Sequence, residues 1–510
     1  MTPTTETPAG DTAARCPFSG TALPAAAPGG QPRLARSDTG LPSHSHRRGF
    51  DALNTEHDYW LDEIAGGLPT TFSGTLFRNG PGRNRIGGRK FGHWFDGDGM
   101  LSRITFSEGR IHYRNRFVRT PKYLEETAAQ KILYRGFGTQ KPGGLLANIG
   151  RPPANVANTS VVYHAGKLLT LWEGGHPWEI DPRTLETIGE YHYGGALKKM
   201  WPFSAHGKIN PVTREYVNFG VQPGKESRIN IYRISPAGQL VATGHFPLRA
   251  PVFLHDFALT ENYAVFFIGP VEFQGIWRFL AGTASLDDCM TFDPRRPTRV
   301  MVADLRTMEL VVDSEIPAGV FIHFGNSYEE DGRIVTEVTR YPDFEVNNAL
   351  RDMFNAEMPN AGDFWRYTID LASGRIDGAP IPGLLQCEFP VFDWRRGMQR
   401  HRYSWMATMA DNGTKIFFNS LQKHDRETGA VQTHDFGPGR FTMEPLFMPA
   451  HADAAEDEGY LATIVYDYRK DRSEVVVLDA ADITRTVATG TLKHHVPFGF
   501  HGCYVPKVFS

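Results

Sequence analysis

The sequence predicts an all-β fold and, within that class, a seven-bladed β-propeller. From Leu68 onward, short runs rich in Val, Ile, Phe and Tyr alternate with turns rich in Gly, Asp, Asn and Pro, which is typical of short antiparallel strands. Helical periodicity is scarce, and its clearest candidates, residues 123–134 and 346–358, are interpreted as helices inserted between strands. An internal repeat then selects the propeller within the all-β class.

The repeat is a strand that ends in an apolar residue, followed by Asp or Ser and a turn containing Pro, Thr or Gly. Its Asp or Ser stands at positions 107, 181, 235, 304, 370, 425 and 479, so the successive intervals are 74, 54, 69, 66, 55 and 54 residues. Seven marks at about the length of a four-stranded blade favour a seven-bladed propeller. Because these turn residues are common in all β-proteins, a β-sandwich assembly stays open on this evidence alone.

Composition predicts a leader followed by a single domain. Residues 1–45 are rich in Thr, Ala, Pro and Gly and lack apolar periodicity, so we expect a disordered leader before one propeller domain at residues 46–510. The N-terminal segment has acidic residues and no basic stretch followed by an apolar one, which argues against a signal or transit peptide. No run of 18 apolar residues is present, which excludes a membrane-spanning helix.

Charge and cysteine usage exclude further classes. The formal net charge is −3 and no long Lys/Arg run occurs, so nucleic acid is not expected as a partner. The four cysteines, Cys16, Cys289, Cys387 and Cys503, form no CxxC pair, which argues against a disulfide framework and a structural zinc site. We therefore expect a cytoplasmic protein. Contact with the inner face of the membrane and the oligomeric state are left open.

Four of the 19 histidines occupy comparable contexts, each in or beside an apolar strand and close to Gly, Asp or Asn. They are His206, His255, His323 and His501, separated by 49, 68 and 178 residues, and a closed ring of blades can bring them together on its axis. Neutral imidazoles suit Fe, Zn, Cu or Ni, and four ligands in an octahedral site leave two positions open, unlike a structural zinc site. The alternative for each is a hydrogen-bonded core histidine. His176 and the adjacent His494 and His495 are interpreted as surface, turn or hydrogen-bonding residues.

Three acidic residues support a metal site. Glu173, Glu388 and Glu444 stand among large apolar neighbours in LLTLWEGG, CEFPVF and FTMEPLFMP. An acid in such a setting needs a partner, and the second N–H of a metal-bound imidazole is a suitable one. An exposed Glu at a strand edge is the alternative for each. Asp256, next to His255, could orient the backbone of its turn or another polar group, and the sequence does not choose between these roles.

The same segments carry a family resemblance. The motifs GTLFRNGPG (residues 74–82), HWFDGDGM (93–100), FGTQKPGG (137–144) and FGFHGCY (498–504), with LWEGG, CEFP, MEPLFMP and the four histidine segments, occur in order from about residue 60 to the end. On these residues the sequence resembles the carotenoid cleavage oxygenases, above all the bacterial apocarotenoid oxygenases, with stilbene-cleaving dioxygenases as relatives.

The resemblance implies a seven-bladed propeller with a cap of helices and loops over an axial Fe²⁺. His206, His255, His323 and His501 would bind the ion, and Glu173, Glu388 and Glu444 would hold these histidines. The implied reaction is that of a non-haem Fe(II) dioxygenase, in which O₂ adds across one conjugated C=C bond of a small apolar substrate and two carbonyl products form. The cleaved bond and the number of oxygen atoms incorporated are not indicated.

The resemblance also suggests substrate contacts. The insert VEFQGIWRFLAG (residues 271–282) is similar to inserts that line a tunnel mouth and a membrane-facing patch, so we expect Phe273 and Trp277 to contact substrate. The same insert could cover a lipid surface where the substrate enters, through Phe273, Ile276, Trp277, Phe279 and Leu280, with Ile132, Leu133 and Tyr134. Ordinary packing between loops is the alternative.

A different substrate class and a different function class stay open. Tyr113 matches the Tyr with which stilbene-cleaving relatives hold a phenolic hydroxyl, but RPPANV, before Ala157, lacks the expected Lys. Cleavage of a stilbenoid or phenylpropenoid alkene to aromatic aldehydes is therefore an alternative substrate reading. A non-catalytic propeller that binds a partner through its loops is the alternative function.

Overall fold

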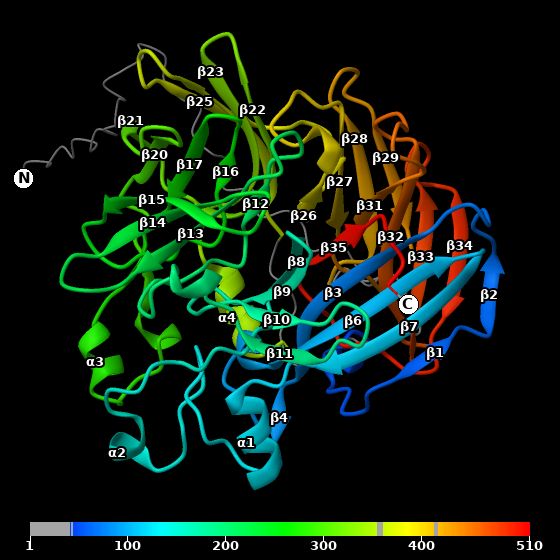
Figure 1. The fold of residues 1–510 in the computed structure, drawn as a ribbon, viewed down its shortest axis with the longest axis horizontal. Helices are drawn as coiled ribbons and strands as arrows, with labels where there is room; N and C mark the ends of the chain where they lie inside the picture. The colour runs from blue at the N-terminus through cyan, green and yellow to red at the C-terminus, as the bar shows by residue number, and fades with distance from the viewer. Residues whose placement is uncertain (1–40, 42–43, 354–360, 413–416, 510) are drawn as a thin grey trace, which may run out of the picture. The chain divides into compact units, whose positions relative to one another are not determined.

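Seven antiparallel sheets arranged as blades make up the fold in the described part of the chain, which confirms the predicted β-propeller (Figure 1). The computed structural model describes residues 41, 44–353, 361–412 and 417–509. Residues 39–510 form one structural unit. The predicted leader, residues 1–45, lies almost wholly outside the described residues and stays a prediction.

Five blades each consist of four strands that follow one another in the sheet. The first two of these are β8 (Ser160–His164), β9 (Lys167–Leu171), β10 (Trp178–Ile180) and β11 (Thr187–Glu190), and β12 (Lys208–Ile209), β13 (Tyr216–Gln222), β14 (Arg228–Ile234) and β15 (Leu240–Pro247). The next is β16 (Ala258–Leu259), β17 (Tyr263–Ile268), β20 (Thr298–Asp304) and β21 (Leu310–Ile316). The last two are β22 (Val320–Glu330), β23 (Arg333–Tyr341), β24 (Asp363–Asp370) and β25 (Ile376–Pro380), and β26 (Cys387–Val391), β27 (Tyr403–Thr408), β28 (Ser420–Asp425) and β29 (Val431–Asp435).

The other two blades join the two ends of the chain. One has the order β1 (Asp58–Trp60), β7 (Arg110–Phe117), β6 (Asp98–Ser107), β3 (Gly74–Arg83) and β35 (Gly502–Val505). The other has the order β2 (Glu63–Gly66), β34 (Thr486–Thr491), β33 (Arg472–Asp479) and β32 (Gly459–Asp467), which pairs with β30 (Arg440–Phe441) and β31 (Leu446–Pro449). Because β35 pairs with β3 and β2 pairs with β34, strands from opposite ends of the sequence close the ring.

All seven marks of the sequence repeat fall at one place in the blade, the turn between its third and fourth strands. Ser107, for example, ends β6 and Asp479 ends β33. The side chains explain the pattern, because Asp181 Oδ1 accepts backbone N–H bonds from Arg183 and Thr184, and Asp304 Oδ1 accepts them from Arg306 and Thr307. An Asp in this position closes the turn that follows it.

Helices interrupt the blades at a few points. They are α1 (Pro121–Ala129), α2 (Gly144–Asn148), α3 (Ile276–Leu280) and α4 (Glu345–Arg351), with short 3₁₀ helices at Arg47–Phe50, Trp94–Asp96, Tyr193–Gly195, Asp287–Cys289 and Trp394–Arg396. Two small hairpins accompany them, β4 (Arg85–Ile86) with β5 (Arg89–Lys90), and β18 (Val271–Phe273) with β19 (Met290–Phe292).

The predicted helices are present with different bounds. The helix expected at 123–134 begins earlier, because Thr120 caps the N–H of Tyr123 and Pro121 opens the first turn, and it ends at Ala129 because Gln130 is left-handed with φ 51°. The helix expected at 346–358 corresponds to α4, and part of its predicted range lies outside the described residues. The five-residue helices α2 and α3 are too short for periodicity to reveal.

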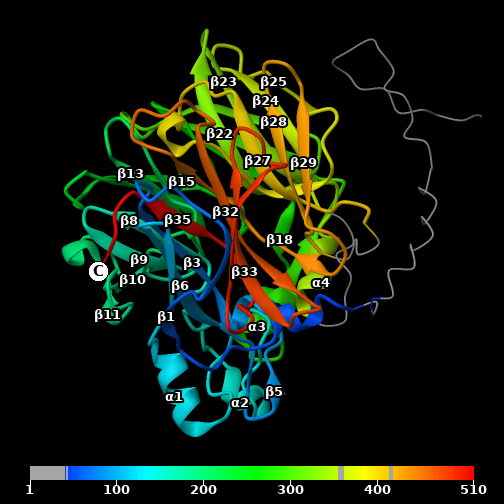
Figure 2. The same ribbon diagram turned by 90° about the vertical axis from the view of Figure 1, so that its right-hand side faces the viewer.

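A cap of helices and loops covers one end of the propeller, as predicted. Figure 1 and Figure 2 both place α1, α2 and α3 at the same end of the described unit. The buried guanidinium of Arg135 holds this cap together by donating hydrogen bonds to the carbonyl oxygens of Asn148, Phe279 and Ala284 at 2.8–3.1 Å. In the described part of the chain, no helix is long and apolar enough to cross a membrane.

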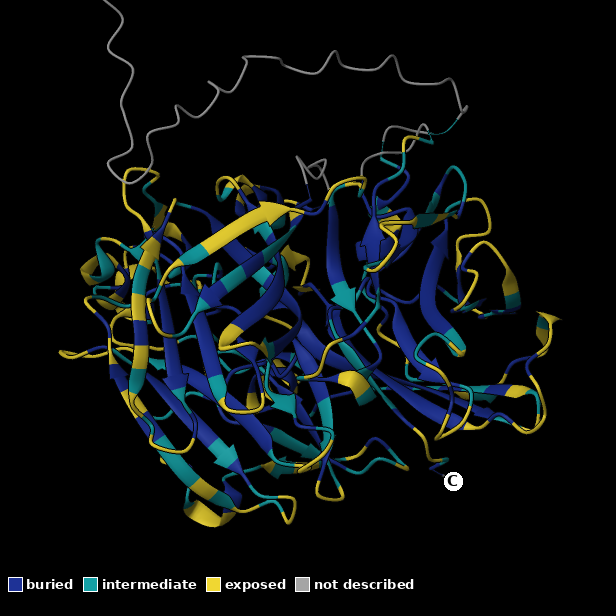
Figure 3. Ribbon diagram, turned by 90° about the horizontal axis from the view of Figure 1, so that it is seen from above, coloured by how far each residue is buried: buried dark blue, intermediate teal, exposed yellow. Residues whose placement is uncertain are grey.

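The core lies between neighbouring blades. Most strands are buried along their central stretches, and exposed residues concentrate in turns and outer strands (Figure 3). Phe219 of β13 packs on Phe266 of β17, with ring centroids 5.6 Å apart, and Phe267 packs on Tyr367 of β24 at 5.1 Å. Large aromatic contacts of this kind fix each blade against the next and so fix the inner strand ends that face the axis.

Candidate metal centre

Four histidines meet where the innermost strands of different blades begin. His206, His255 and His501 stand just before β12, β16 and β35, and His323 lies near the start of β22. One ring nitrogen of each lies within 4.8 Å of those of the other three, and Nε2 of His255 is 3.1 Å from Nε2 of His323. The structure thus brings together all four residues that the sequence singled out.

Each of the three predicted glutamates contacts a different one of these histidines. Glu173, which follows β9, pairs with Nδ1 of His255, and Glu388 of β26 pairs with Nδ1 of His323. Glu444 accepts a hydrogen bond from Nδ1 of His501 at 2.8 Å. A carboxylate that binds Nδ1–H leaves the lone pair of Nε2 directed to the centre.

The glutamates are themselves held in place. Glu388 Oε1 accepts bonds from the hydroxyls of Tyr341 at 2.7 Å and Thr339 at 3.2 Å. Glu444 Oε2 accepts the backbone N–H of Gly502 at 2.8 Å, next to His501 in the chain. These contacts lock the carboxylates and, through them, the orientation of the imidazole rings.

The chemistry of the donor set fits a divalent transition metal. Among the described residues, the buried Nε2 of His206 has no hydrogen-bond partner, and no carboxylate accompanies this ring. Burial, reinforced by the neighbouring imidazoles, holds the pKa of His206 well below its usual range, so its lone pair is free at neutral pH. An unpartnered nitrogen facing three other imidazoles is accounted for by a shared ion.

The other pKa shifts reflect burial and the paired acids. Burial lowers the pKa of His501, although Glu444 acts in the opposite direction. Burial also acts to lower the pKa of His255, but Glu173 outweighs it and raises that pKa above its usual range. For Glu388, burial acts to raise the pKa, but the contact with His323 outweighs it together with the bonds from Tyr341 and the Phe389 N–H, so the net shift is downward. The Glu388 carboxylate therefore supplies negative charge beside His323.

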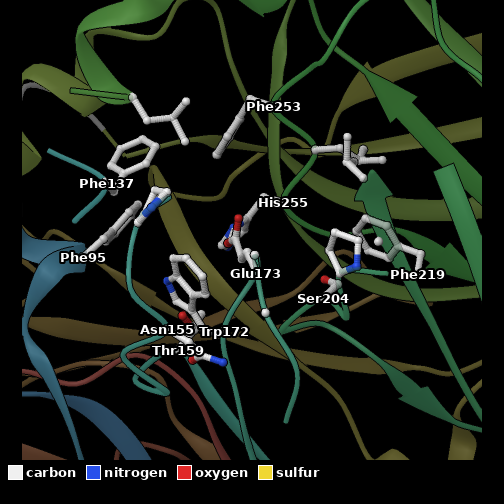
Figure 4. A pocket seen from close by; sticks show the side chains of 18 of the residues that line it. Phe95, Phe137, Asn155, Thr159, Trp172, Glu173, Ser204, Phe219, Phe253 and His255 are labelled. Carbon is white, nitrogen blue, oxygen red and sulfur yellow. Dashed lines mark ion pairs between the residues drawn. The ribbon is translucent and has the colours of Figure 1, made fainter. Parts of the chain in front are cut away.

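A cavity of about 1170 Å³ opens from this centre. His255, His323 and His501 belong to its wall, together with a large set of aromatic residues that includes Phe95, Phe137, Trp172, Phe253, Phe389 and Phe500. Figure 4 shows Glu173 beside His255, with Phe253, Phe95 and Phe137 around the same space and Thr159 and Ser204 among the few polar groups. The wall suits a long apolar molecule that reaches the four imidazoles.

Some of the residues expected to contact substrate line the cavity, and others do not. Phe273 lines the cavity, as do Ile276, Phe279 and Leu280 of α3. Trp277 does not line it, and its residue is 68% exposed on the outside of the cap. Trp277 therefore offers no contact inside the cavity, because the helix turns this side chain to solvent. Its exposed position is compatible with the lipid-covering role that the sequence also suggested.

Tyr113 and Ile132 are also placed differently from expectation. Tyr113 is fully buried on β7, packs against Leu61 and Ile104, and its hydroxyl lies 3.1 Å from Ser102 Oγ, so it cannot contact a substrate in the cavity. Ile132, expected at a lipid surface, is buried against Ile86 and Phe91. Phe279 is likewise buried. The motif match of Tyr113 and the apolar character of Ile132 and Phe279 do not reveal burial, which depends on packing between segments distant in sequence.

Sequence reasoning missed a second cluster on the cavity wall. His176, Glu190 and His192 lie close together, and His176, interpreted as a surface, turn or hydrogen-bonding residue, is buried and does make hydrogen bonds. In the sequence, Glu190 and His192 alternate with a residue between them, which places them on one face of a strand. This signal is weak, because only the strand pairing shows that His176 lies opposite His192.

Comparison with known proteins places this geometry in a family. The profile of the family described as retinal pigment epithelial membrane protein matches residues 50–506. The apocarotenoid-15,15'-oxygenase of Synechocystis sp. is 36% identical over 474 residues, which cover 90% of this chain and 95% of the relative. The isoeugenol monooxygenase of Pseudomonas nitroreducens is 29% identical, with 89% of this chain and 96% of the relative covered.

A solved structure agrees with these sequence matches. The structure of cobalt-substituted Synechocystis apocarotenoid oxygenase superimposes with a TM-score of 0.84 at 34% identity and covers 91% of this chain and 99% of that chain. The sequence matches and the structural match therefore agree with each other over nearly the whole described chain.

Proposed function

This chain belongs to the retinal pigment epithelial membrane protein family, which includes the carotenoid cleavage oxygenases, and we propose that it is a non-haem Fe(II) dioxygenase. Its reaction would cleave one conjugated C=C bond of an apocarotenoid or carotenoid with O₂ to give two carbonyl products. The observation that carries the proposal is the set of four converging imidazoles on the wall of a large, mainly aromatic cavity.

His206, His255, His323 and His501 would hold the iron, with Glu173, Glu388 and Glu444 fixing three of the rings. Bound Fe²⁺ supplies the one-electron chemistry that lets O₂ react with a closed-shell alkene. The protein's own residues then have three tasks. They hold the imidazole tautomers, bind the substrate, and exclude water from the reacting bond.

The cavity wall performs the second and third tasks. Phe253 stacks near His255, with ring centroids 6.0 Å apart, and Phe389 stacks on His323 at 5.1 Å. A polyene that replaces water along such a wall gains about 25 cal/mol per Å² of apolar surface buried. Because the aromatic rings flank the imidazoles, they would position one double bond beside the centre rather than the whole chain at random.

An apolar patch on the cap supports entry from a membrane. Leu146 of α2 and Trp277 of α3 are 82% and 68% exposed, and Leu145, Ile149 and Leu280 are exposed as well. The segment that follows α2 is linked to the end of α3, because the N–H of Gly150 donates to the carbonyl oxygen of Leu280 at 2.9 Å. Large apolar side chains grouped at the cavity's cap fit shallow insertion into a lipid surface.

We infer peripheral contact with a membrane and a cytoplasmic location. The thiols of the described cysteines are all free, which also suits this location.

A phenylpropenoid or stilbenoid substrate is the second candidate. The isoeugenol monooxygenase relative supports it. Against it, Tyr113 is not available to hold a phenolic hydroxyl. Lys199 is on the cavity wall and could serve a phenolate, so the two substrate classes are best separated directly.

The decisive experiment uses the purified chain loaded with Fe²⁺ and offered an apocarotenal or a hydroxystilbene. We expect about one iron per chain bound at the four histidines, O₂-dependent loss of polyene absorbance, and two aldehydes by mass analysis. His255→Ala should lose both iron and turnover, while His451→Ala, at an exposed His–Glu pair, should lose neither.

Unchanged iron and turnover in His255→Ala would overturn the proposal. A non-catalytic propeller that binds a partner through its loops would show no turnover.

A further inference from the structure

A second group of metal-ligating side chains lies on the cavity wall, apart from the four central histidines. His176 precedes β10, Glu190 ends β11, and His192 follows two residues later. All three line the cavity. We propose that His176, Glu190 and His192 form a second divalent transition-metal site, of the kind that takes Zn²⁺ or Co²⁺.

Strand pairing explains why the two histidines face each other. In the β10–β11 ladder Trp178 is opposite Glu190, and the N–H of Tyr191 donates to the carbonyl oxygen of Pro177 at 2.8 Å. Continuing this register by two residues from Trp178 and Glu190 places His176 opposite His192. Directly opposed side chains on one face of an antiparallel pair are close neighbours, so the ladder itself builds the pair.

One ligand atom of each residue lies within 4.8 Å of those of the other two, close enough for all three to reach one ion. Nδ1 of His176 is 2.8 Å from Nδ1 of His192 and 3.6 Å from Oε1 of Glu190. Two ligands bound tetrahedrally at about 2.0–2.1 Å from zinc lie about 3.3 Å apart, between these two separations. Two imidazoles and one carboxylate are a common set for such ions, and the carboxylate balances part of the charge.

The tautomer of His176 is already set for binding. Its Nε2 lies 3.0 Å from the carbonyl oxygen of Lys198, which can only accept, so Nε2 carries the proton and Nδ1 presents a lone pair. A backbone carbonyl on the far nitrogen is the usual partner of a metal-bound histidine. The backbone of His176 is held too, because Asn155 Nδ2 donates to its carbonyl oxygen at 2.8 Å.

The other members are accessible to an incoming ion. His176 is buried, whereas the side chains of Glu190 and His192 are each 43% exposed. The backbone of His192 is fixed by the turn that follows, since its carbonyl oxygen accepts the N–H groups of Gly195 and Leu197. One anchored ring and two reachable ligands allow an ion to enter from solvent and displace the proton shared between the two Nδ1 atoms.

Metal titration of the full chain tests the proposal. The metal-free protein is titrated with Co²⁺ alone, and bound cobalt is counted by elemental analysis after removal of the free ion. We expect two equivalents in the wild type and one in His192→Ala or Glu190→Gln. His451→Ala is the matched control, because it removes an exposed imidazole that also faces a glutamate, and it should still bind two. Circular dichroism of each variant confirms folding, which the exposure of His192 and Glu190 favours.

The same titration separates this site from the proposed iron centre. His255→Ala should retain the cobalt bound at His176, Glu190 and His192. A wild type that binds one equivalent, lost in His255→Ala and kept in His192→Ala, would overturn the second site and leave the iron centre standing. Two equivalents in both His192→Ala and Glu190→Gln would overturn it as well, because the second ion would then lie elsewhere.

Discussion

Asp256 Oδ2 accepts a hydrogen bond from the backbone N–H of Phe324, with 2.8 Å between the two atoms. The two residues directly follow His255 and His323, so this bond joins the backbones that carry two converging imidazoles. The other oxygen, Oδ1, pairs with Lys208 Nζ at 3.0 Å, two residues after His206. One carboxylate therefore connects three histidine-bearing segments, a role that the sequence had left undecided for Asp256.

Removing this carboxylate should loosen the centre. Asp256→Ala leaves the buried Phe324 N–H without its partner, which costs about 1–3 kcal/mol. It also removes the part-buried ion pair with Lys208. We expect a lower free energy of unfolding for the metal-free protein in urea and weaker Co²⁺ binding at the four histidines. Asp256→Asn, whose amide oxygen can still accept the N–H of Phe324, should lose less. Equal stability and equal cobalt affinity in wild type and Asp256→Ala would contradict the role.

Glu388→Gln should weaken metal binding without unfolding the blade. Glu388 contacts His323 Nδ1, Tyr341 and Thr339, and an amide cannot hold the imidazole N–H with the same charge. Loss of such a partner lowers metal affinity by about 10–100-fold. Cobalt titration with a competing chelator measures the change.

The control for this variant is Glu329→Gln. Glu329 also accepts bonds from a hydroxyl and a backbone N–H, those of Thr260 and Asn262, but none from a histidine of the centre. Its substitution should leave cobalt affinity unchanged. A similar loss in both variants would show that Glu388 acts through general stability alone.

The Glu337 carboxylate should contribute an acid-sensitive part of stability. Burial acts to raise the pKa of Glu337, but His401 and Arg366 outweigh it and lower that pKa from 4.5 to about 2. Since the unfolded chain binds this proton first, the contribution is complete above pH 4.5 and is lost as the pH falls toward 2. Its full size is on the order of 3 kcal/mol.

Urea unfolding of Glu337→Gln between pH 5 and 3 checks this linkage. The variant should be less stable than the wild type at pH 5, and its stability should fall less steeply with acid. The exposed Glu63→Gln serves as the control and should keep the wild-type slope. Parallel slopes for wild type and Glu337→Gln would show that the Glu337 carboxylate does not carry this dependence.

The exposed patch of α2 and α3 should bind lipid. Each large apolar side chain transferred from water contributes about 1.5–3 kcal/mol, and 1.4 kcal/mol corresponds to a tenfold change in partitioning. Leu146→Ser with Trp277→Ser should therefore reduce sedimentation with phospholipid vesicles by tenfold or more. Val212→Ser with Val241→Ser removes exposed apolar residues from another blade and should change nothing. Unaltered sedimentation of the α2 and α3 variant would exclude this surface.

The blade repeat could be recognised in the sequence because each turn is closed by hydrogen bonds between residues that are close in the chain. Asp181 and Asp304 close the same turn in different blades with bonds to backbone groups two and three residues ahead, so the repeat survives without any long-range contact. The histidines were readable for a related reason. His206, His255 and His501 stand where inner strands begin, a context that short sequence windows preserve.

Short stretches of sequence could not reveal contacts between segments that lie far apart in the chain. Tyr113 was expected to hold a phenolic hydroxyl and Ile132 to face lipid. Tyr113 instead lies in a buried cluster beside Tyr59, and Ile132 lies in one with Ile86 and Phe91. Trp277 turns to solvent because the other face of the short helix α3 holds the buried Phe279.

By itself, the sequence determined the blade repeat and the family resemblance, and that resemblance indicated which histidines and glutamates converge. Only the tertiary structure decided how the ends close the ring through β35 and β2, how Asp256 joins three segments, and how His176 comes to face His192. The physical reason is the distance along the chain over which each effect acts. Turn closure and strand periodicity act over a few residues, whereas register, burial and the meeting of side chains depend on which segments pack together after the chain has folded.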